Sequence, residues 1–418
     1  MKAMLHYIWW GGCLLAAGCE SPRAGDRPTA VNTPATPVRQ QFSVTLSPAD
    51  FDRAAQVIRF QLPLNAPHAA FLRDAANNLI PLQIEADNTA TFFVPMQKAG
   101  EAPAYTFALL APKPERDTVQ AVKEEGRLAL TVEGKPAFYY QMALAQPPRA
   151  GIADKILRGA FLYPIFTPNG VQMSDTYPED HPHDHGIWTA WASSQFQGRH
   201  VDFWNPHYAY GGTVEFVALD HLWSGAVDAG FESRHRSLDR TVTPPVDALD
   251  EKWRVSLYAA PGVPARVFDL ELFQTPATAD PLLVLQYDYG GLGVRGSSQW
   301  QNKDNLTVLN SQGTTDRVKS NNEPARWFFM GGKIDGAPAG ITVLDHPSNF
   351  RAPQPVRMNP TDPFFMYSVI NEGFTISQDQ PYRASYRFLV QDGPPDAKFL
   401  EACWQGFAHP AVATVIVK

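Results

Sequence analysis

The sequence predicts an all-β protein with two antiparallel β-sandwiches, a small immunoglobulin-like one followed by a large one. The chain of 418 residues contains 37 prolines, 29 glycines and 12% aromatic residues, which is typical of many short strands joined by turns. Stretches of roughly four to eight residues that alternate or run apolar recur along most of its length. Because so many strands need two packed sheets to bury their apolar sides, we expect sandwiches rather than a helical bundle.

Residues 1–19 predict a lipoprotein signal peptide. Lys2 precedes a short apolar stretch that ends in Leu15-Ala16-Ala17-Gly18-Cys19. Small residues directly before a cysteine are what a lipoprotein signal peptidase requires, so we expect Cys19 to be acylated and to become the mature N-terminus. The alternative is an uncleaved membrane anchor, but the apolar run is shorter than the ~20 residues that a spanning helix needs. We therefore expect a bacterial lipoprotein, anchored at the outer membrane or in the periplasm.

The following residues divide into a tether and two domains. Residues 20–40 are rich in Pro, Thr and Ala and predict a flexible tether. Residues 41–112 contain about five strand-like stretches, which suit an immunoglobulin-like sandwich. They carry no cluster of acids, histidines or cysteines, so we expect a structural or adhesive module. The sequence PKPERD (residues 112–117) predicts a linker, and residues 118–418 predict the large sandwich domain.

Within the large domain, a hairpin is expected to turn at Glu133-Gly134, between RLALTV and KPAFYYQ. One segment has a helical pattern: Asp396 can cap AKFLEACWQGFA, where Phe399, Cys403 and Phe407 fall on one side. The later strand-like stretches are KWRVSLYAA, ARVFDLELFQT, LLVLQYDYG, ARWFFMGG, AGITVLDH, FFMYSVI and YRASYRFLV.

The net charge argues against a nucleic-acid-binding protein, and the cysteine content argues against an intrachain disulfide. The net charge is −7 and no basic run occurs, which argues against nucleic-acid binding because that needs a positive surface. Cys13 would be lost with the signal peptide and Cys19 acylated. Cys403 would then be alone, so we expect no intrachain disulfide.

The segment DHPHDHGIW (residues 180–188) carries the strongest functional signal. It places His181, His183 and His185 at alternating positions between Asp180 and Asp184, and six of the 11 histidines lie between residues 181 and 221. Proline breaks the backbone pattern here, and the apolar GIWTAW follows. A polar loop that leads into a buried strand is a common way to build a site.

A metal site is one interpretation of these histidines. The His-Glu-x-x-His motif of zincins is absent, and the spacing fits neither metallo-β-lactamases nor cupins. His181 and His183 form a His-x-His pair, which His185 and Asp202 could complete. A divalent metal is therefore retained as the alternative cofactor, with no cofactor expected for certain.

Acid–base chemistry is the second interpretation, because imidazoles beside carboxylates can move protons near neutral pH. Asp180, Asp184 and Asp202 are near enough in sequence to orient them. The third interpretation is a hydrogen-bonded loop without chemistry. It is favoured for any single histidine but not for three within five residues.

Aromatic and amide side chains near this loop suit a sugar, whose C–H groups stack on rings while its hydroxyls pair with polar groups. Trp188 and Trp191 lie on an apolar strand and are expected in the core. Trp204 lies among turn residues and is expected to line a pocket.

Several motifs resemble, in order, an uncharacterised bacterial family carried under the label "methane oxygenase PmoA". They are YPIFTPNGV, DHPHDHGIWTAW, VDFW, DYGGLGVRG, NSQG, ARWFFMGG and LDHPSNFRAP, which span roughly residues 120–392. A particulate methane monooxygenase subunit is a bundle of membrane helices, and this sequence offers no such helix, so that activity is not expected. The resemblance implies an accessory to glycan breakdown, and the large domain is similar to the galactose-mutarotase type of super-sandwich.

The family's motif usually has the form Asp-His-Pro-His-His-Arg-Gly. Asp180, His181, His183 and Gly186 match it, whereas Asp184 and His185 replace the usual His-Arg pair. The replacement removes a cation beside the histidines and puts in doubt any role that required one. Further matches lie in GGLGVRG and DHPSN, and a tryptophan usual after the second is missing. These further matches are Arg295, Asp345, His346 and Asn349.

Together these observations predict a lipid-anchored protein that acts on glycans or sugar derivatives by epimerisation, β-elimination or hydrolysis. The alternatives are a glycan-binding lipoprotein without catalysis and a metal-dependent enzyme using His181 and His183. The predicted catalytic residues are Asp180, His181, His183, Asp345 and His346. The predicted substrate-binding residues are His185, Asp202, Trp204, Arg295 and Asn349.

Overall fold

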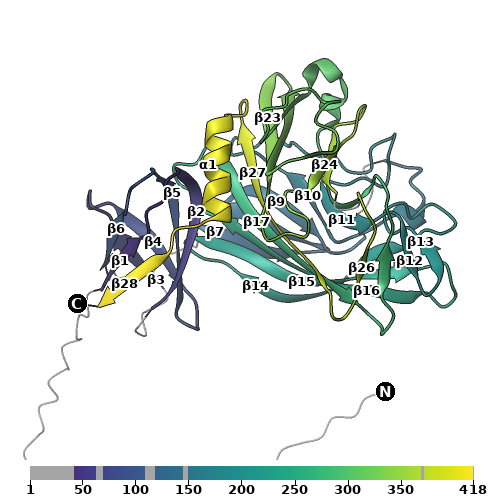
Figure 1. Cartoon of the computed structure of the whole chain (residues 1–418), viewed down its shortest axis with the longest axis horizontal. Coiled ribbons are helices and arrows are strands. Elements are labelled where there is room, and N and C mark those ends of the chain that lie inside the picture. The colour runs from purple at the N-terminus through teal and green to yellow at the C-terminus, as the bar shows by residue number, and fades with distance from the viewer. Residues whose placement is uncertain (1–41, 63–68, 109–117, 145–148, 369–370, 418) are drawn as a thin grey trace, which may run out of the picture. The chain divides into compact units, whose positions relative to one another are not determined.

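The computed structural model describes residues 42–62, 69–108, 118–144, 149–368 and 371–417 (Figure 1). In this part the chain is nearly all β, with antiparallel sheets and one α-helix, which confirms the predicted all-β class. The predicted signal peptide, the lipidation site Cys19, the tether and the linker 112–117 lie outside the described residues. No helix among the described residues combines the length and the apolarity that crossing a membrane requires.

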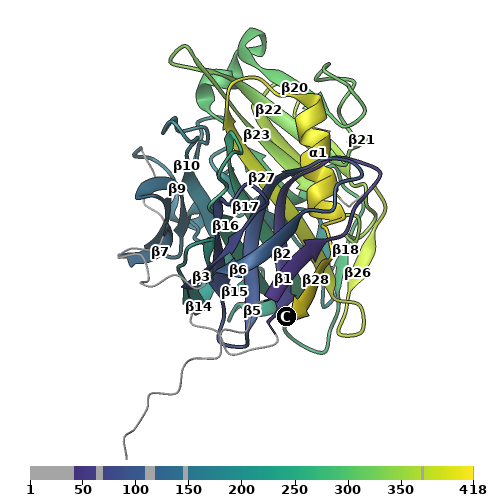
Figure 2. The ribbon, with the colours of Figure 1, turned by 90° about the vertical axis from the view of Figure 1, so that its left-hand side faces the viewer.

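A seven-stranded sheet contains the strands expected in the first module, and these strands enclose a hydrophobic core of their own. Its last strand comes from the other end of the chain: β28 pairs antiparallel with β1, with Phe42 opposite Val417 (Figure 2). The strand order is β2-β5-β4-β3-β6-β1-β28. The strands are β1 (Phe42–Leu46), β2 (Arg53–Gln61), β3 (Ala69–Arg73), β4 (Leu79–Ile84), β5 (Thr89–Gln97), β6 (Ala104–Ala108) and β28 (Ala413–Val417).

The helix α1 (Ala397–Ala408) forms where the sequence predicts it. The Asp396 side chain accepts hydrogen bonds from the backbone N–H groups of Lys398, at 2.9 Å, and Phe399, at 3.1 Å. The helix packs on β2, and a Cβ at Gly406 would lie 2.1 Å from the carbonyl oxygen of Ala54. The glycine is therefore needed for the close approach of helix and strand.

Two large sheets share one extended hydrophobic core. The first has eight strands in the order β14-β15-β16-β17-β27-β23-β22-β20. These are β14 (Thr213–Trp223), β15 (Asp228–Asp239), β16 (Val246–Tyr258), β17 (Ala265–Pro276), β20 (Thr307–Asn310), β22 (Trp327–Ile334), β23 (Ala337–Asp345) and β27 (Tyr382–Asp392).

The second large sheet has nine strands in the order β21-β24-β25-β19-β11-β10-β9-β8-β7. These are β7 (Val119–Glu124), β8 (Arg127–Val132), β9 (Lys135–Gln141), β10 (Phe161–Ile165), β11 (Ile187–Trp191), β19 (Gly290–Arg295), β21 (Glu323–Pro324), β24 (Pro355–Met358) and β25 (Phe364–Tyr367). A small four-stranded sheet and three 3₁₀ turns complete the described elements. They are β12 (Ser194–Phe196), β13 (Arg199–Val201), β18 (Leu282–Val284), β26 (Phe374–Ile376), η1 (Asp154–Ile156), η2 (Ser298–Gln301) and η3 (Lys303–Asn305).

The predicted hairpin is the turn between β8 and β9. Glu133 and Gly134 both have positive φ, at 52° and 75°, as the tight two-residue turn of a hairpin requires. The sequence therefore located this turn to the residue.

The long strands of the eight-stranded sheet alternate between core and solvent. On β15, Phe231 and His235 are buried, whereas Arg234 between them is exposed. The buried His235 donates through Nδ1 to Glu251 Oε1, at 2.9 Å, and its Nε2 lies 2.6 Å from the Tyr140 hydroxyl. Both ring nitrogens of His235 therefore have hydrogen-bond partners inside the core.

Candidate functional site

The histidine-rich loop is fixed to the nine-stranded sheet at the start of β11. A Cβ at Gly186 would lie only 2.2 Å from the carbonyl oxygen of Leu162 on β10, so only glycine allows this approach. The backbone N–H of Arg295 donates to the carbonyl of Gly186 at 2.8 Å, and that of Tyr177 donates to Asp184 at 3.0 Å. The loop is therefore fixed by close contact with β10 and by backbone hydrogen bonds with Arg295 and Tyr177.

Arg295, at the end of β19, forms ion pairs with two carboxylates of the loop. Its guanidinium reaches Asp184 Oδ2 at 3.3 Å and Asp180 Oδ1 at 3.2 Å, although the residue is only 1% exposed. A buried arginine needs such anionic partners, because an unpaired charge in the core is costly. Arg295 was expected to hold a substrate hydroxyl or carboxylate. It holds the loop instead, since both terminal nitrogens are bound to carboxylates.

His181 lies between two carboxylates. Its Nδ1 is 3.2 Å from Asp180 Oδ2 and 3.6 Å from Asp362 Oδ2, and it has no well-directed hydrogen bond. Burial opposes ionisation of Asp180, but a hydrogen bond with Asp362 and the charges of Arg295 and His181 outweigh it and hold the pKa of Asp180 well below its usual value. Asp362 is itself fixed by the Gln301 amide, which donates to Oδ1 at 2.6 Å.

Asp180, His181 and Asp362 together form a candidate metal site. Among the described residues, Asp180, His181 and Asp362 have ligand atoms within 4.8 Å of one another. Two carboxylates and an imidazole suit a divalent ion such as zinc, iron or manganese. The predicted pair was His181 with His183, but His183 lies outside this group, and neither His185 nor Asp202 joins it.

His183 and Asp184 are adjacent ionisable groups whose pKa values are shifted in opposite directions. His183 Nε2 lies 3.9 Å from Asp184 Oδ1. Burial, together with the charges of His207, His181 and Arg295, lowers the pKa of His183 to about 3, so the imidazole is neutral near pH 7. Burial also raises the pKa of Asp184 to about 7, against the opposing charge of Arg295. A neutral base and a half-protonated acid therefore lie side by side.

Both groups line a cavity of about 200 Å³. The cavity is smaller than the roughly 300–1,000 Å³ of sites for drug-sized ligands, so it can hold only a small molecule. Aromatic rings and amides form most of the remaining wall. The lining residues are His181, His183, Asp184, Trp204, Asn205, Tyr208, Tyr287, Tyr289, Asn359 and Phe364.

Two predicted substrate-binding residues near the cavity have structural contacts. Asp202 accepts hydrogen bonds from the backbone N–H groups of Trp204, at 2.9 Å, and Asn205, at 2.8 Å, and so shapes the turn that carries both lining residues. His185 is fully buried and stacks on Phe161 with ring centres 4.4 Å apart. His185 therefore faces the core, and Trp204 is the predicted aromatic residue that reaches the cavity.

The DHPSN segment lies elsewhere, at the end of β23 in the other large sheet. Asp345 accepts hydrogen bonds from the Asn349 amide at 2.7 Å and the Gln354 backbone at 2.8 Å, and burial raises its pKa to about 7. His346 contacts the ring of Phe407 on α1. The structure therefore does not bring Asp345, His346 and Asn349 to the loop, because their strand belongs to a different sheet.

Sequence reasoning missed five residues of the site: Asp362, Tyr287, Tyr289, Asn359 and Phe364. Tyr287 and Tyr289 alternate directly before the glycine pair of DYGG, which is a signal that could have been used. Asp362 and Asn359 come from the turn before β25. Nothing local to NPTD connects that turn with residues 180–184, so only the pairing of β25 with β19 reveals it.

One protein family matches most of the chain. A family model described as "Family of unknown function (DUF6807)" matches residues 127–405. The chain belongs to this family. The match covers the histidine-rich loop, Arg295 and the DHPSN segment, and it confirms the expected uncharacterised family. No curated protein matches the chain.

Several solved structures match this chain at low sequence identity. A glycosyl hydrolase family 38 protein from Enterococcus faecalis has 8% identity and a TM-score of 0.38, over 91% of this chain and 48% of its own. An alpha-mannosidase from Enterococcus faecalis V583 has 9% identity and a TM-score of 0.37, over 91% and 46%. An alpha-galactosidase from Lactobacillus brevis has 9% identity and a TM-score of 0.23, over 72% and 43%. This chain spans less than half the length of each.

Proposed function

We propose that this protein is an enzyme that moves protons on a sugar unit bound in the cavity of His183 and Asp184. One observation carries the proposal: a neutral imidazole and a carboxyl whose pKa is raised to about 7 lie 3.9 Å apart on the wall of a cavity lined with aromatic side chains. Perturbed neighbouring groups of this kind mark acid–base sites.

The arrangement favours β-elimination over hydrolysis. Glycoside hydrolysis uses two carboxyl groups that flank the bond to be broken, roughly 5–9.5 Å apart. Here the base and the acid share one wall, so they serve proton removal and delivery on one side of a sugar ring. His183 would take the proton from the carbon next to a sugar carboxylate. The electrons of that C–H bond would form a C=C bond as the C–O bond breaks, and Asp184 would protonate the departing oxygen.

Recognition of the sugar would rest on the remaining wall. Tyr208, Tyr287 and Tyr289 offer ring surfaces and hydroxyls, and Asn205 and Asn359 offer amides. Arg295 would act through Asp184, because its guanidinium is bound to the loop carboxylates. The small volume of the cavity would admit one ring at a time, as at the end of a chain.

The place of action belongs to the same proposal. The sequence LAAGC before Glu20 fits lipid attachment at Cys19, which would hold the protein at the outer membrane or on the periplasmic side. Labelling with a radioactive or alkyne fatty acid tests this directly. A Cys19→Ser variant should lose the label, and retention of the label would refute the anchor.

The test of the chemistry is turnover on a panel of acidic and neutral oligosaccharides. Elimination gives ultraviolet absorbance from the new C=C bond, hydrolysis gives reducing ends without it, and epimerisation in heavy water incorporates deuterium. We expect absorbance with a uronate-containing substrate, lost in His183→Ala and Asp184→Asn with little change in affinity. A loss of affinity alone, without turnover in the wild type, would indicate a glycan-binding lipoprotein and overturn the proposal.

A second function is favoured by the group Asp180, His181 and Asp362, which could hold a divalent ion. The buried His181 Nδ1, which has no directed hydrogen bond and lies 3.2 Å from Asp180 Oδ2, fits this. A bound ion would supply a Lewis acid beside the cavity. Elemental analysis should then find one equivalent of metal, lost in His181→Ala and kept in His183→Ala. Absence of metal from the wild type would refute this function.

A further inference from the structure

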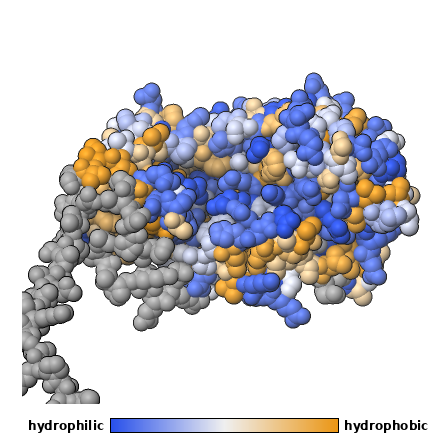
Figure 3. All heavy atoms as spheres, turned by 90° about the horizontal axis from the view of Figure 1, so that it is seen from below, coloured by the Kyte–Doolittle hydropathy of each residue, from blue (hydrophilic) through white to orange (hydrophobic). Residues whose placement is uncertain are grey.

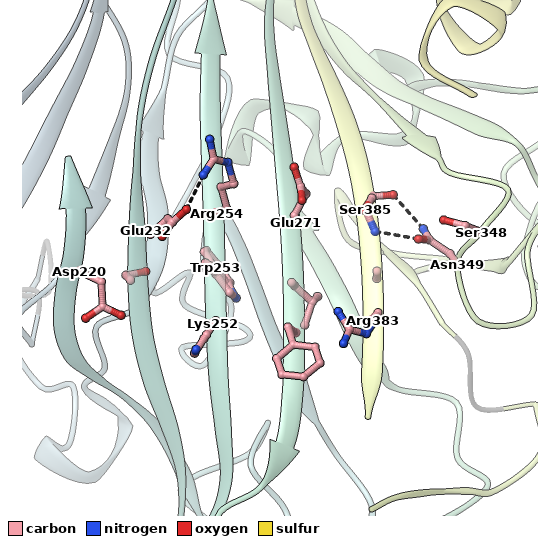
Figure 4. A pocket seen from close by; sticks show the side chains of 14 residues that line it. Asp220, Glu232, Lys252, Trp253, Arg254, Glu271, Ser348, Asn349, Arg383 and Ser385 are labelled. Carbon is pink, nitrogen blue, oxygen red and sulfur yellow. Dashed lines mark hydrogen bonds and ion pairs between the residues drawn. The ribbon is translucent and has the colours of Figure 1, made fainter. Parts of the chain in front are cut away.

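A second and larger cavity, of about 470 Å³, lies on the outer side of the eight-stranded sheet (Figure 4). Its wall is formed across β14, β15, β16, β17 and β27 together with the DHPSN segment. Charged side chains dominate it: Asp220, Glu232, Lys252, Arg254, Glu271 and Arg383. None of these residues belongs to the His183 cavity.

Strand register arranges part of the wall as a row of two cations around an aromatic ring. Lys252 is paired with Phe273, and Phe273 with Arg383, on three neighbouring strands. Adjacent strands are about 4.8 Å apart, so the three side chains lie next to one another on one side of the sheet. The Arg383 guanidinium lies 4.1 Å from the centre of the Phe273 ring. Within the described residues, neither Lys252 nor Arg383 has a carboxylate partner.

The next row of the same sheet has the opposite character. Here Arg254 is paired in register with Glu271, and Glu271 with Ser385. Glu232 forms an ion pair with Arg254, which leaves Glu271 without an ion pair in the described part of the chain. Figure 4 shows Lys252 and Arg383 at one level of the sheet and Arg254, Glu271 and Ser385 at the next. The cavity therefore has free positive charge along one row and a free hydrogen-bond acceptor in the other.

We infer that this cavity is a second binding site, one for an acidic glycan that carries carboxylate or sulfate groups. Lys252 and Arg383 would bind the anionic group, while Phe273 supports the sugar ring and Glu271 accepts hydrogen bonds from hydroxyls. The inference does not depend on the chemistry proposed for His183.

A ligand that is anionic along its whole length fits less well. Polyphosphate or nucleic acid would place charge against Glu232 and Glu271, and the protein carries a net charge of −7. A sugar chain alternates hydroxyl-rich rings with separate anionic groups, which matches the two rows. Seen from below the view of Figure 1, hydrophilic residues gather across the middle of the molecule (Figure 3).

The test is isothermal titration of the full chain with three probes: a hyaluronan tetrasaccharide, which carries carboxylates on alternate rings, a κ-carrageenan tetrasaccharide, which carries sulfates on alternate rings, and neutral maltotriose. We expect at least one acidic probe to bind and maltotriose not to bind. Lys252→Gln and Arg383→Gln should each weaken that binding about tenfold or more, as loss of a charged contact does. Lys333→Gln removes an exposed cation from the same sheet outside the cavity and should leave binding unchanged.

The probes also separate the two anions, because carboxylate and sulfate are carried by different sugars. His183→Ala should bind the acidic probe at this cavity as the wild type does, so failure of the catalytic proposal would leave this result intact. Equal binding of maltotriose, no binding of either acidic probe, or unchanged affinity in a folded Lys252→Gln/Arg383→Gln double variant would each overturn the inference.

Discussion

The guanidinium of Arg295 lies 3.3 Å from the carboxylate of Asp184 in a position where the arginine is 1% exposed and the aspartate 3%. The two residues are 111 positions apart in the sequence and come from different segments of the nine-stranded sheet region. Their pairing fixes the histidine-rich loop and places Asp184 against the cavity. The same guanidinium also explains why Asp180 and Asp184 can lie close together in the loop.

Loss of the arginine should destabilise the protein strongly. Arg295→Met leaves Asp184 and Asp180 without their cation, and breaking a buried ion pair from one side costs about 3–5 kcal/mol. Urea unfolding followed by tryptophan fluorescence measures the change. Arg236→Met is the matched control: it breaks an exposed pair with Glu215, so it should cost less than about 1 kcal/mol. Equal effects of the two substitutions would contradict the structural role given to Arg295.

Activity should fall as the pH rises through about 7. Asp184 acts as the acid in its protonated form, and burial raises its pKa to about 7, so deprotonation above that pH removes the acid. His183, with its pKa lowered to about 3, stays neutral across the same range and adds no limb there. Initial rates from pH 5 to 9 test this. Asp184→Asn should lose about 10²–10⁴-fold in kcat and also lose the alkaline limb. A limb near pH 7 that persists in the variant would assign it to another group.

Stability should respond to pH through Asp345. Burial raises the pKa of its carboxyl to about 7, whereas in the unfolded chain the carboxyl ionises with a pKa near 3.8. The unfolded state therefore releases its proton first, and the contribution of this group to stability declines as pH rises from about 4 to about 7. Relative to Asp345→Asn, the wild type should lose stability over that window. Urea midpoints at pH 4, 5.5 and 7 measure this, and parallel curves for the two proteins would disprove it.

Gly186→Ala should disrupt the loop. The added Cβ would lie 2.2 Å from a backbone oxygen of Leu162, so β10 or the loop must move. We expect a loss of more than about 3 kcal/mol in unfolding free energy, in the range of severe steric substitutions. Gly198→Ala is the control, because nothing lies within 4 Å of the added Cβ there. Its φ of +76° still strains an alanine, by about 1–2 kcal/mol.

Local features of the fold were predictable because their causes are local. The turn at Glu133-Gly134 and the cap at Asp396 rest on the conformational and hydrogen-bonding preferences of single residues. The β28 strand could not be assigned to the first sheet, because its partner Phe42 lies at the other end of the chain. Neither segment carries a sequence feature that indicates a partner so far along the chain.

The site follows the same division. Motif reasoning brought the loop and Arg295 together, and the structure places them in contact. The same reasoning placed Asp345 and His346 with them, because motifs in one sequence do not reveal which sheet each strand joins. Asp362 was missed for the converse reason, since it reaches His181 through sheet pairing alone.

The partnership of β1 with β28 has a consequence for biosynthesis. The hydrogen bond from Val412 to Ser47, beside this pair, spans 365 positions. On the ribosome, β1 emerges early and its edge stays open until β28 has been made. Closing so long a loop is slow, and an open strand edge invites pairing with other chains. Nascent chains of this protein should therefore depend on holding chaperones until β28 has been made and has paired with β1.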